Sequence, residues 1–211
     1  MLNSLTPLLA TMMFVGMVPM LAVVVTAFTK VTIVLLILRN ALGIQQTPPN
    51  IVIYSIAIIL SALIMQPVLQ SSANRVPVDK VGTMTMQELG ATASSAAEPF
   101  RNFMIDNTSE SSRQFFTGIA QKRSKNPDVT AVDFIVLIPA FLMDELTKSF
   151  NMGFLIYIPF IAIDFIVGAI LIALGMQMMS ATAIATPLKI LLFVEVQGWE
   201  RMFDMLLMSY K

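Results

Sequence analysis

The apolar run between Leu8 and Leu38 limits the choice of fold more than any other feature of this chain. A bilayer core is about 30 Å thick and takes about 20 apolar helical residues. This run is longer than that and contains Pro19 and Lys30. We therefore expect a broken or strongly tilted helix, with a charge in apolar sequence that marks function or assembly.

Lys30 belongs to a short polar group within this run. Thr26, Thr29 and Lys30 have the spacing i, i+3, i+4, which places them on one face of a helix. Two interpretations stay open from the sequence. Either the lysine reaches the membrane interface from near a helix end, or the polar stripe faces other subunits.

Composition supports a membrane protein and excludes several classes of chemistry. The chain is 56% hydrophobic and only 12% charged, whereas a soluble domain carries about 25% charge. The net charge is zero, so nothing suggests nucleic acid. Without cysteine or histidine there is no disulfide, thiolate, histidine base or common zinc site, and no P-loop is present. We expect no cofactor, no metal and no enzymatic activity.

A distinctive loop and a second apolar helix follow the first run. Gly43 permits a helix C-cap, Pro48 and Pro49 prevent the helix from continuing, and Asn50 can cap the next helix. Ile51 to Leu69 predicts that helix, with Pro67 at its end. The first residues of the chain lack the positive region of a secretory signal, so we expect the first run to be retained.

Residues 71–130 have a different character, rich in Ser, Thr, Ala and charge, and predict a water-exposed insert. Apolar residues at helical spacing between Glu98 and Gln121 predict one or two short amphipathic helices, and residues 71–95 are expected to be loosely structured. The positive-inside rule weakly favours a cytoplasmic insert.

The last part of the chain is again apolar. Val132 to Phe141 is too short to span a membrane, whereas Met152 to Leu174 is long enough. Residues 175–180 predict a turn, and Pro187 suits the first turn of a last helix that ends near Leu207. The predicted fold is an all-α membrane protein with about four long apolar helices in two hairpins, at 1–70 and 131–211, around a polar, mainly helical insert at 71–130.

Three more charges lie in or beside this apolar sequence, namely Glu145, Asp164 and Lys189. Asp164 and Lys189 are obvious partners, since each would be costly unpaired. However, Asp164 lies about 16 Å before the turn, measured along its helix. If the next helix starts at Pro187, Lys189 lies only about 3 Å past that helix start. A simple hairpin would separate them, so we expect a contact between subunits or a bent helix, with both residues supporting assembly.

Several short motifs occur in a fixed order over nearly the whole chain. They are Phe28-Thr29-Lys30, Arg39-Asn40-Ala41-Leu42-Gly43, Pro48-Pro49-Asn50, Pro99-Phe100-Arg101, Ile138-Pro139-Ala140-Phe141 with Glu145, Ile158-Pro159-Phe160 with Asp164, Ala173-Leu174-Gly175-Met176 and Pro187-Leu188-Lys189. With these motifs the chain resembles the FliP/SctR family, the core proteins of the flagellar and injectisome type III export apparatus. Asn107-Thr108-Ser109 and Arg113-Gln114-Phe115-Phe116 favour the injectisome branch.

The resemblance implies a ring, understood as a pentamer, that assembles with two smaller membrane proteins of the SctS-like and SctT-like kinds. It implies an entry portal for unfolded secreted substrates in the bacterial inner membrane, within the basal body. Downstream export-gate and switch proteins would be further partners. The resemblance places the polar insert on the periplasmic side, and we prefer this to the charge rule.

Met176, Met178 and Met179 lie in the short loop between the last two apolar segments. Methionine is deformable and fits many contact shapes, and an apolar constriction can close a pore by dewetting. The resemblance implies that this loop is a gasket, although Gln177 interrupts it here. The alternative is that these methionines only pack against helices.

Two other functions remain open from the residues. Scattered membrane charges and proline-broken helices also fit a small-solute secondary transporter, but we find no inverted repeat. A membrane enzyme would have to rely on Asp144 and Asp164, which lie in no recognisable catalytic motif. A structural, channel-forming export subunit is the leading hypothesis.

Overall fold

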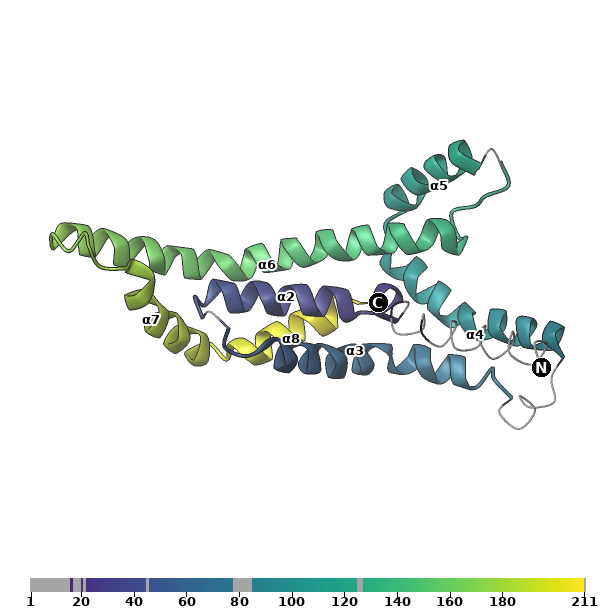
Figure 1. The fold of residues 1–211 in the computed structure, drawn as a ribbon, viewed down its shortest axis with the longest axis horizontal. Helices are drawn as coiled ribbons and strands as arrows, with labels where there is room; N and C mark the ends of the chain where they lie inside the picture. The colour runs from purple at the N-terminus through teal and green to yellow at the C-terminus, as the bar shows by residue number, and fades with distance from the viewer. Residues whose placement is uncertain are drawn as a thin grey trace, which may run out of the picture. The chain divides into compact units, whose positions relative to one another are not determined.

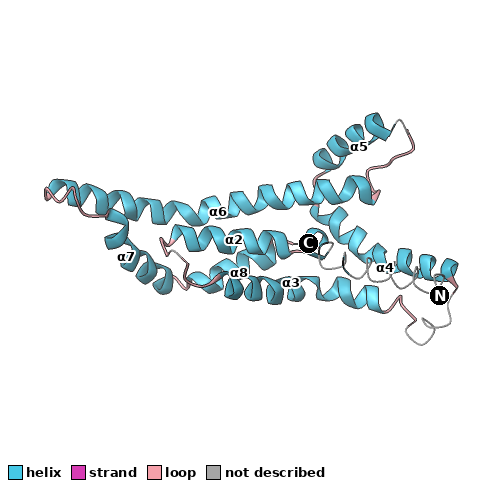
Figure 2. Ribbon diagram, viewed as in Figure 1, coloured by secondary structure: helices cyan, strands magenta, loops and turns pink. Residues whose placement is uncertain are grey.

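The computed structural model describes residues 16, 20, 22–44, 46–77, 85–124 and 127–210. Within those ranges the chain forms helices and no strands, so the predicted all-α class is confirmed (Figure 2). The helices are α2 (Phe28–Ala41), α3 (Asn50–Ala73), α4 (Met86–Asn107), α5 (Glu110–Ser124), α6 (Phe134–Ala173), α7 (Ala181–Glu195) and α8 (Gly198–Met208).

Two of these helices, α3 and α6, are long and apolar enough to cross a membrane. The α7–α8 pair, bent by 65°, could form a third span if its two parts act as one. The predicted number of four long apolar helices is therefore not confirmed. Much of the run from Leu8 lies outside the described residues, but residues 22–25 are helical and a bend at Thr26 and Ala27 separates them from α2. The expected break in the first run is thus present.

The chain divides into two compact units. The first comprises Met1–Thr29 with Met65–Asp144, and the second comprises Lys30–Ile64 with Glu145–Lys211. In the first unit Met104 is fully buried, and the rings of Phe103 and Phe141 pack edge to face with centroids 5.8 Å apart. In the second unit α2 lies beside α6 (Figure 1). Gly153 permits this close approach, because a Cβ atom there would lie 2.4 Å from Ile37.

The structure corrects the prediction that α6 is two separate segments. The helix runs without a break for 40 residues, about 60 Å at 1.5 Å per residue, which is twice the thickness of a bilayer core. The charges that interrupt the apolar pattern do not end the helix, since Asp144 and Glu145 both have hydrogen-bond partners. The charged residues at 144 and 145 therefore lie inside one continuous helix and do not mark a helix end.

The predicted end of the second helix and the predicted start of the insert's first helix are also wrong. Helix α3 passes Pro67 and continues to Ala73, and α4 already begins at Met86, so residues 71–95 are not loosely structured where the structure describes them. Thr85 caps α4 in a reciprocal capping box with Glu88. Such a cap satisfies orphan N–H groups at a helix start, which explains an α4 longer than its apolar pattern suggested.

The last helix begins at Ala181 rather than at Pro187, and it is not continuous. Packing of Ala185 against Val167 and Leu171 extends α7 upstream of its proline. The helix then ends at Glu195, and Gln197 has a left-handed φ of 53° before α8. The predicted last helix is therefore two helices joined by a sharp bend.

Candidate functional site

A buried charge cluster joins α2, α6 and the residues after α8, all within the second unit. Lys30 Nζ lies 3.2 Å from Glu145 Oε1, and both side chains are 0% exposed. The Tyr210 hydroxyl donates to Glu145 Oε2, and the ammonium of Lys30 lies 3.4 Å from the centroid of the Tyr210 ring. One aromatic residue therefore contacts both charges: its ring faces the ammonium of Lys30 in a cation–π contact, and its hydroxyl donates a hydrogen bond to Glu145.

This geometry excludes the interpretation that Lys30 reaches the membrane interface, because its side chain is fully buried in the chain. The predicted stripe is also interrupted. Thr26 Oγ1 donates to the carbonyl of Ala22, and Thr29 Oγ1 donates to that of Val23. The three residues do not form one helical face, because the chain bends at Thr26.

A second cluster joins Asp164 of α6 to Lys189 of α7. Lys189 Nζ lies 2.6 Å from Asp164 Oδ2 and 3.1 Å from the carbonyl oxygen of Ala41. Ala41 is the last residue of α2, where carbonyl groups lack partners within the helix and the dipole is negative. One ammonium thus neutralises a carboxylate and caps a helix end.

The two residues pair within one chain, although we expected a neighbouring subunit or a bent helix. Our argument assumed that the helix of Lys189 starts at Pro187. Because α7 starts at Ala181, Lys189 lies eight residues, about 12 Å, into the helix. That brings it to nearly the depth of Asp164, so an ordinary hairpin pairs them.

The signature loop between α2 and α3 is held by side-chain contacts. Arg39 donates to Asn50 Oδ1 at 2.6 Å and to the carbonyl of Pro48 at 3.4 Å. The carbonyl of Asn40 accepts from the N–H of Gly43, which has φ +73°. A Cβ atom on Gly43 would lie 2.9 Å from Thr186 Oγ1, so this position requires glycine for both conformation and space. Pro49 accepts from the first amides of α3, at Val52 and Ile53.

The methionine loop follows a well-formed helix end. The N–H of Met176 bonds the carbonyl of Leu171, and that of Gly175, at φ +73°, bonds the carbonyl of Ile172. This is a Schellman motif, which sets the direction of the chain as it leaves α6. Met178 is 100% exposed, Met176 40% and Met179 47%. The side chain of Met178 therefore makes no packing contact within this chain, whereas Met176 and Met179 are partly covered by it.

Comparison with known proteins decides the family. The FliP family model matches residues 11–206. The chain belongs to the FliP family. A probable translocation protein, y4yL, of Sinorhizobium fredii is 39% identical over 210 residues, covering 98% of this chain and 95% of the relative. The harpin secretion protein HrpW of Pseudomonas syringae pv. syringae is 40% identical over 204 residues, covering 92% and 95%.

The virulence protein YscR of Salmonella typhimurium is 37% identical over 216 residues, covering 99% of this chain and 98% of the relative. The names of these relatives describe translocation, secretion and virulence, which supports the injectisome branch of the FliP family. The resemblance drawn from the sequence motifs is confirmed. The protein has a role in a type III secretion apparatus, and its apolar helices are consistent with a membrane location.

The first unit of this FliP-family chain contains a contact that the sequence did not predict. Asp144 of α6 accepts hydrogen bonds from the N–H of Ser109 and from Ser112 Oγ, each at 2.5 Å. Ser109 directly precedes α5 and caps it, since Ser109 Oγ accepts from the N–H of Ser112. The carboxylate of Asp144, from a distant helix, holds this capping residue in place. The sequence shows only a charge near an apolar segment, and the spacing of 35 residues to Ser109 carries no signal.

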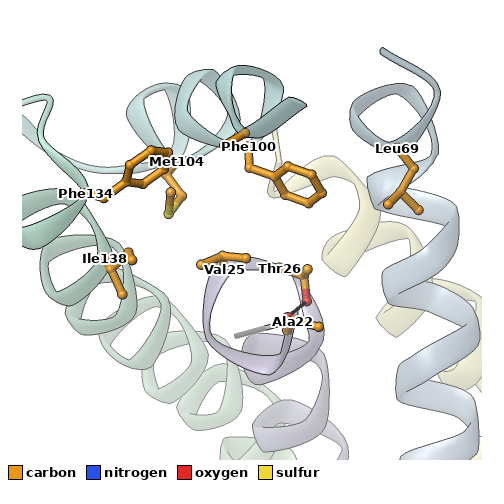
Figure 3. Close-up of a pocket in the computed structure, with 9 residues that line it drawn as sticks. Ala22, Val25, Thr26, Leu69, Phe100, Met104, Phe134 and Ile138 are labelled. Carbon is orange, nitrogen blue, oxygen red and sulfur yellow. Dashed lines mark hydrogen bonds between the residues drawn. The ribbon is translucent and has the colours of Figure 1, made fainter. Parts of the chain in front are cut away.

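The first unit also contains an apolar pocket, shown in Figure 3. The only polar side chain among its described lining residues is that of Thr26, whose hydroxyl is bonded to Ala22. The pocket gives a polar solute no partner among these residues. The described lining residues are Ala22, Val25, Thr26, Leu69, Ala97, Phe100, Met104, Phe134 and Ile138.

Proposed function

We propose that this FliP-family chain is a channel-forming structural subunit of an injectisome export apparatus in the bacterial inner membrane, within the basal body. In this proposal it forms a closed ring, a pentamer, with two smaller SctS-like and SctT-like membrane proteins. The ring is the entry portal for unfolded secreted substrates. The chain does no catalysis, needs no cofactor, and works with downstream export-gate and switch proteins.

The exposed methionine loop is the observation that carries the proposal. Met178 is fully exposed in the loop that follows α6, and Met176 and Met179 of the same loop are partly exposed. Leaving such side chains in water costs free energy, which a ring would recover by bringing several loops together. Unbranched thioether side chains then form an apolar, deformable constriction that can seal around chains of different shape.

The distribution of charge gives independent support. Lys30, Glu145, Asp164 and Lys189 are paired within the chain, so their charges are neutralised before any assembly. Both candidate spans expose many large apolar side chains, for example Ile59 and Phe165. Such apolar side chains suit contact with lipid or with apolar neighbouring subunits.

The test is ion leakage through the complex made with its two small membrane partners. Replacing Met176, Met178 and Met179 together by alanine should open the seal and raise the resting conductance by about tenfold or more, while replacement by leucine should keep it closed. Met208→Ala is the matched control, since Met208 is exposed but lies outside the loop. A triple-alanine complex as tight as the native one, or a chain that stays monomeric with the partners present, would contradict the proposal.

A further inference from the structure

We propose that Tyr210 is a positioning residue for secretion, which orients Glu145 toward Lys30 and holds the segment after α8 against α2 and α6. Figure 1 shows this end of the chain beside the start of α2. The inference uses the secretion role of the family but depends on neither the ring nor the methionine seal. It can therefore fail, or hold, independently of the proposed portal.

The buried ion pair is the first step of the argument. Lys30 and Glu145 are both 0% exposed. Removing two charges from water is expensive, and their mutual attraction compensates only if their remaining donors and acceptors are also satisfied. Lys30 reaches one carboxylate oxygen, Oε1. The pair is thus stable only if Oε2 also has a donor.

Tyr210 supplies that donor and a second contact. Its hydroxyl donates to Glu145 Oε2, and its ring lies under the ammonium of Lys30 at 3.4 Å. A hydrogen bond to a charged acceptor is worth more than one to a neutral group. The carboxylate is held at both oxygens, so it cannot rotate away from Lys30 while Tyr210 is in place.

Glu145 lies in the core of the second unit, so the direction in which its carboxylate points affects the contact between α2 and α6. Ser149 Oγ donates to the backbone carbonyl of Glu145 at 2.5 Å, and Val31 follows Lys30 as a fully buried residue. The cluster thus lies where α2 and α6 meet in the core. A purely space-filling role for Tyr210 would need only the ring, whereas a positioning role needs the hydroxyl.

Two variants separate these roles. Tyr210→Phe keeps the ring and removes the hydroxyl, and Tyr210→Leu removes both. Each is introduced into the full-length chain and into a background that carries Lys30→Met and Glu145→Gln, which removes both charges together. Tyr54→Phe on α3 is the matched control, because Tyr54 is exposed. The readouts are the thermal unfolding midpoint in detergent and the secretion of a reporter per unit of membrane-inserted protein.

We expect Tyr210→Phe to lower the unfolding midpoint by several degrees in the native background, and by less than half of that in the neutralised background. Secretion per inserted chain should fall by at least about threefold, because Glu145 loses the donor that holds it toward Lys30. Tyr54→Phe should change neither. Equal shifts in the two backgrounds, or normal secretion by Tyr210→Leu, would overturn the inference.

Discussion

Lys189 on α7 lies 2.6 Å from Asp164 on α6, and the same ammonium bonds the last carbonyl of α2. A single side chain thus connects three helices of the second unit. Asp164 Oδ1 has no hydrogen-bond partner among the described residues, so Lys189 interacts with one oxygen only. The pair is asymmetric, with a buried lysine and a carboxylate that is about one third exposed.

Asp164→Ala should destabilise the protein and impair assembly, because it leaves the ammonium of Lys189 with the Ala41 carbonyl alone. Breaking a fully buried pair costs about 3–5 kcal/mol, and the partial exposure of Asp164 reduces our expectation to about 1–3 kcal/mol. The measurement is thermal unfolding followed by Trp199 fluorescence, together with secretion. Asp164→Ala that assembled and secreted normally would refute the role of the pair.

A double variant is the control for that experiment. Asp164→Asn with Lys189→Met removes both charges and keeps similar volumes, so it should recover at least half of the stability lost in Asp164→Ala. If the double variant is no more stable than Asp164→Ala, the loss comes from packing rather than from an unpaired charge.

Gly43→Ala should cost more stability than Gly175→Ala. Both glycines have φ +73°, so both substitutions pay about 1–2 kcal/mol for the left-handed backbone. Only at Gly43 does the new Cβ also meet another residue, Thr186 Oγ1 at 2.9 Å, whereas nothing lies within 4 Å at Gly175. Unfolding midpoints of the two variants check the order. Equal losses would show that contact with Thr186 adds nothing.

Protonation of Glu88 should loosen the start of α4. The backbone N–H and the hydroxyl of Thr85 bond the Glu88 carboxylate and hold its pKa below its usual range. A lowered folded-state pKa stabilises the native state above the unfolded pKa, about 4.3, and this contribution is lost as the pH falls through the folded value. Hydrogen-exchange protection in the first turn of α4 should be constant from about pH 7 to 5 and fall below about pH 4. Glu88→Gln is the control, and a pH profile identical to that of native protein would contradict this assignment.

Asp144→Ala should free the start of α5 without unfolding α6. The carboxylate accepts from Ser112 and from Ser109, the residue that caps α5. Losing a hydrogen bond to a charged acceptor costs about 1.5–3 kcal/mol. Faster hydrogen exchange in residues 110–114, with unchanged exchange in residues 150–170, is the expected result. Glu110→Gln is the control, since its side chain bonds only within α5. Unchanged exchange in Asp144→Ala would show that Ser109 caps α5 without help from this carboxylate.

The sequence predicted what composition and local order determine. The length of the apolar runs predicted a helical membrane protein. The polar residues near Thr26 predicted the break before α2, and the motifs in their fixed order indicated the family. Gly43, Pro48 and Asn50 marked a loop that the structure shows held by Arg39. These features are determined by residues that are close together in the sequence, so they can be predicted from one sequence.

The sequence could not give contacts between distant residues. Glu145 is 115 residues from Lys30, and Tyr210 carries no pattern that links it to either. The start of α7 depends on packing of Ala185 against α6, which overrode the helix-start preference of Pro187. Because the predicted start of α7 was wrong, Lys189 was placed at the wrong depth. An ion pair between Lys189 and Asp164 within one helical hairpin therefore seemed impossible. The roles of Met176, Met178, Met179 and the signature residues in assembly stay predictions.

The most direct test of the portal is disulfide crosslinking of Met178→Cys inside an assembled secretion apparatus. This chain has no native cysteine, so Met178→Cys supplies its single thiol. Phe115→Cys on α5, an exposed position outside the loop, is the matched control. The account predicts that mild oxidation joins Met178→Cys chains into covalent dimers at high yield, while Phe115→Cys chains remain single, and that an unfolded substrate stalled in transit lowers the yield. Met178→Cys chains that stay monomeric in an intact apparatus would contradict a ring closed by its methionine loops.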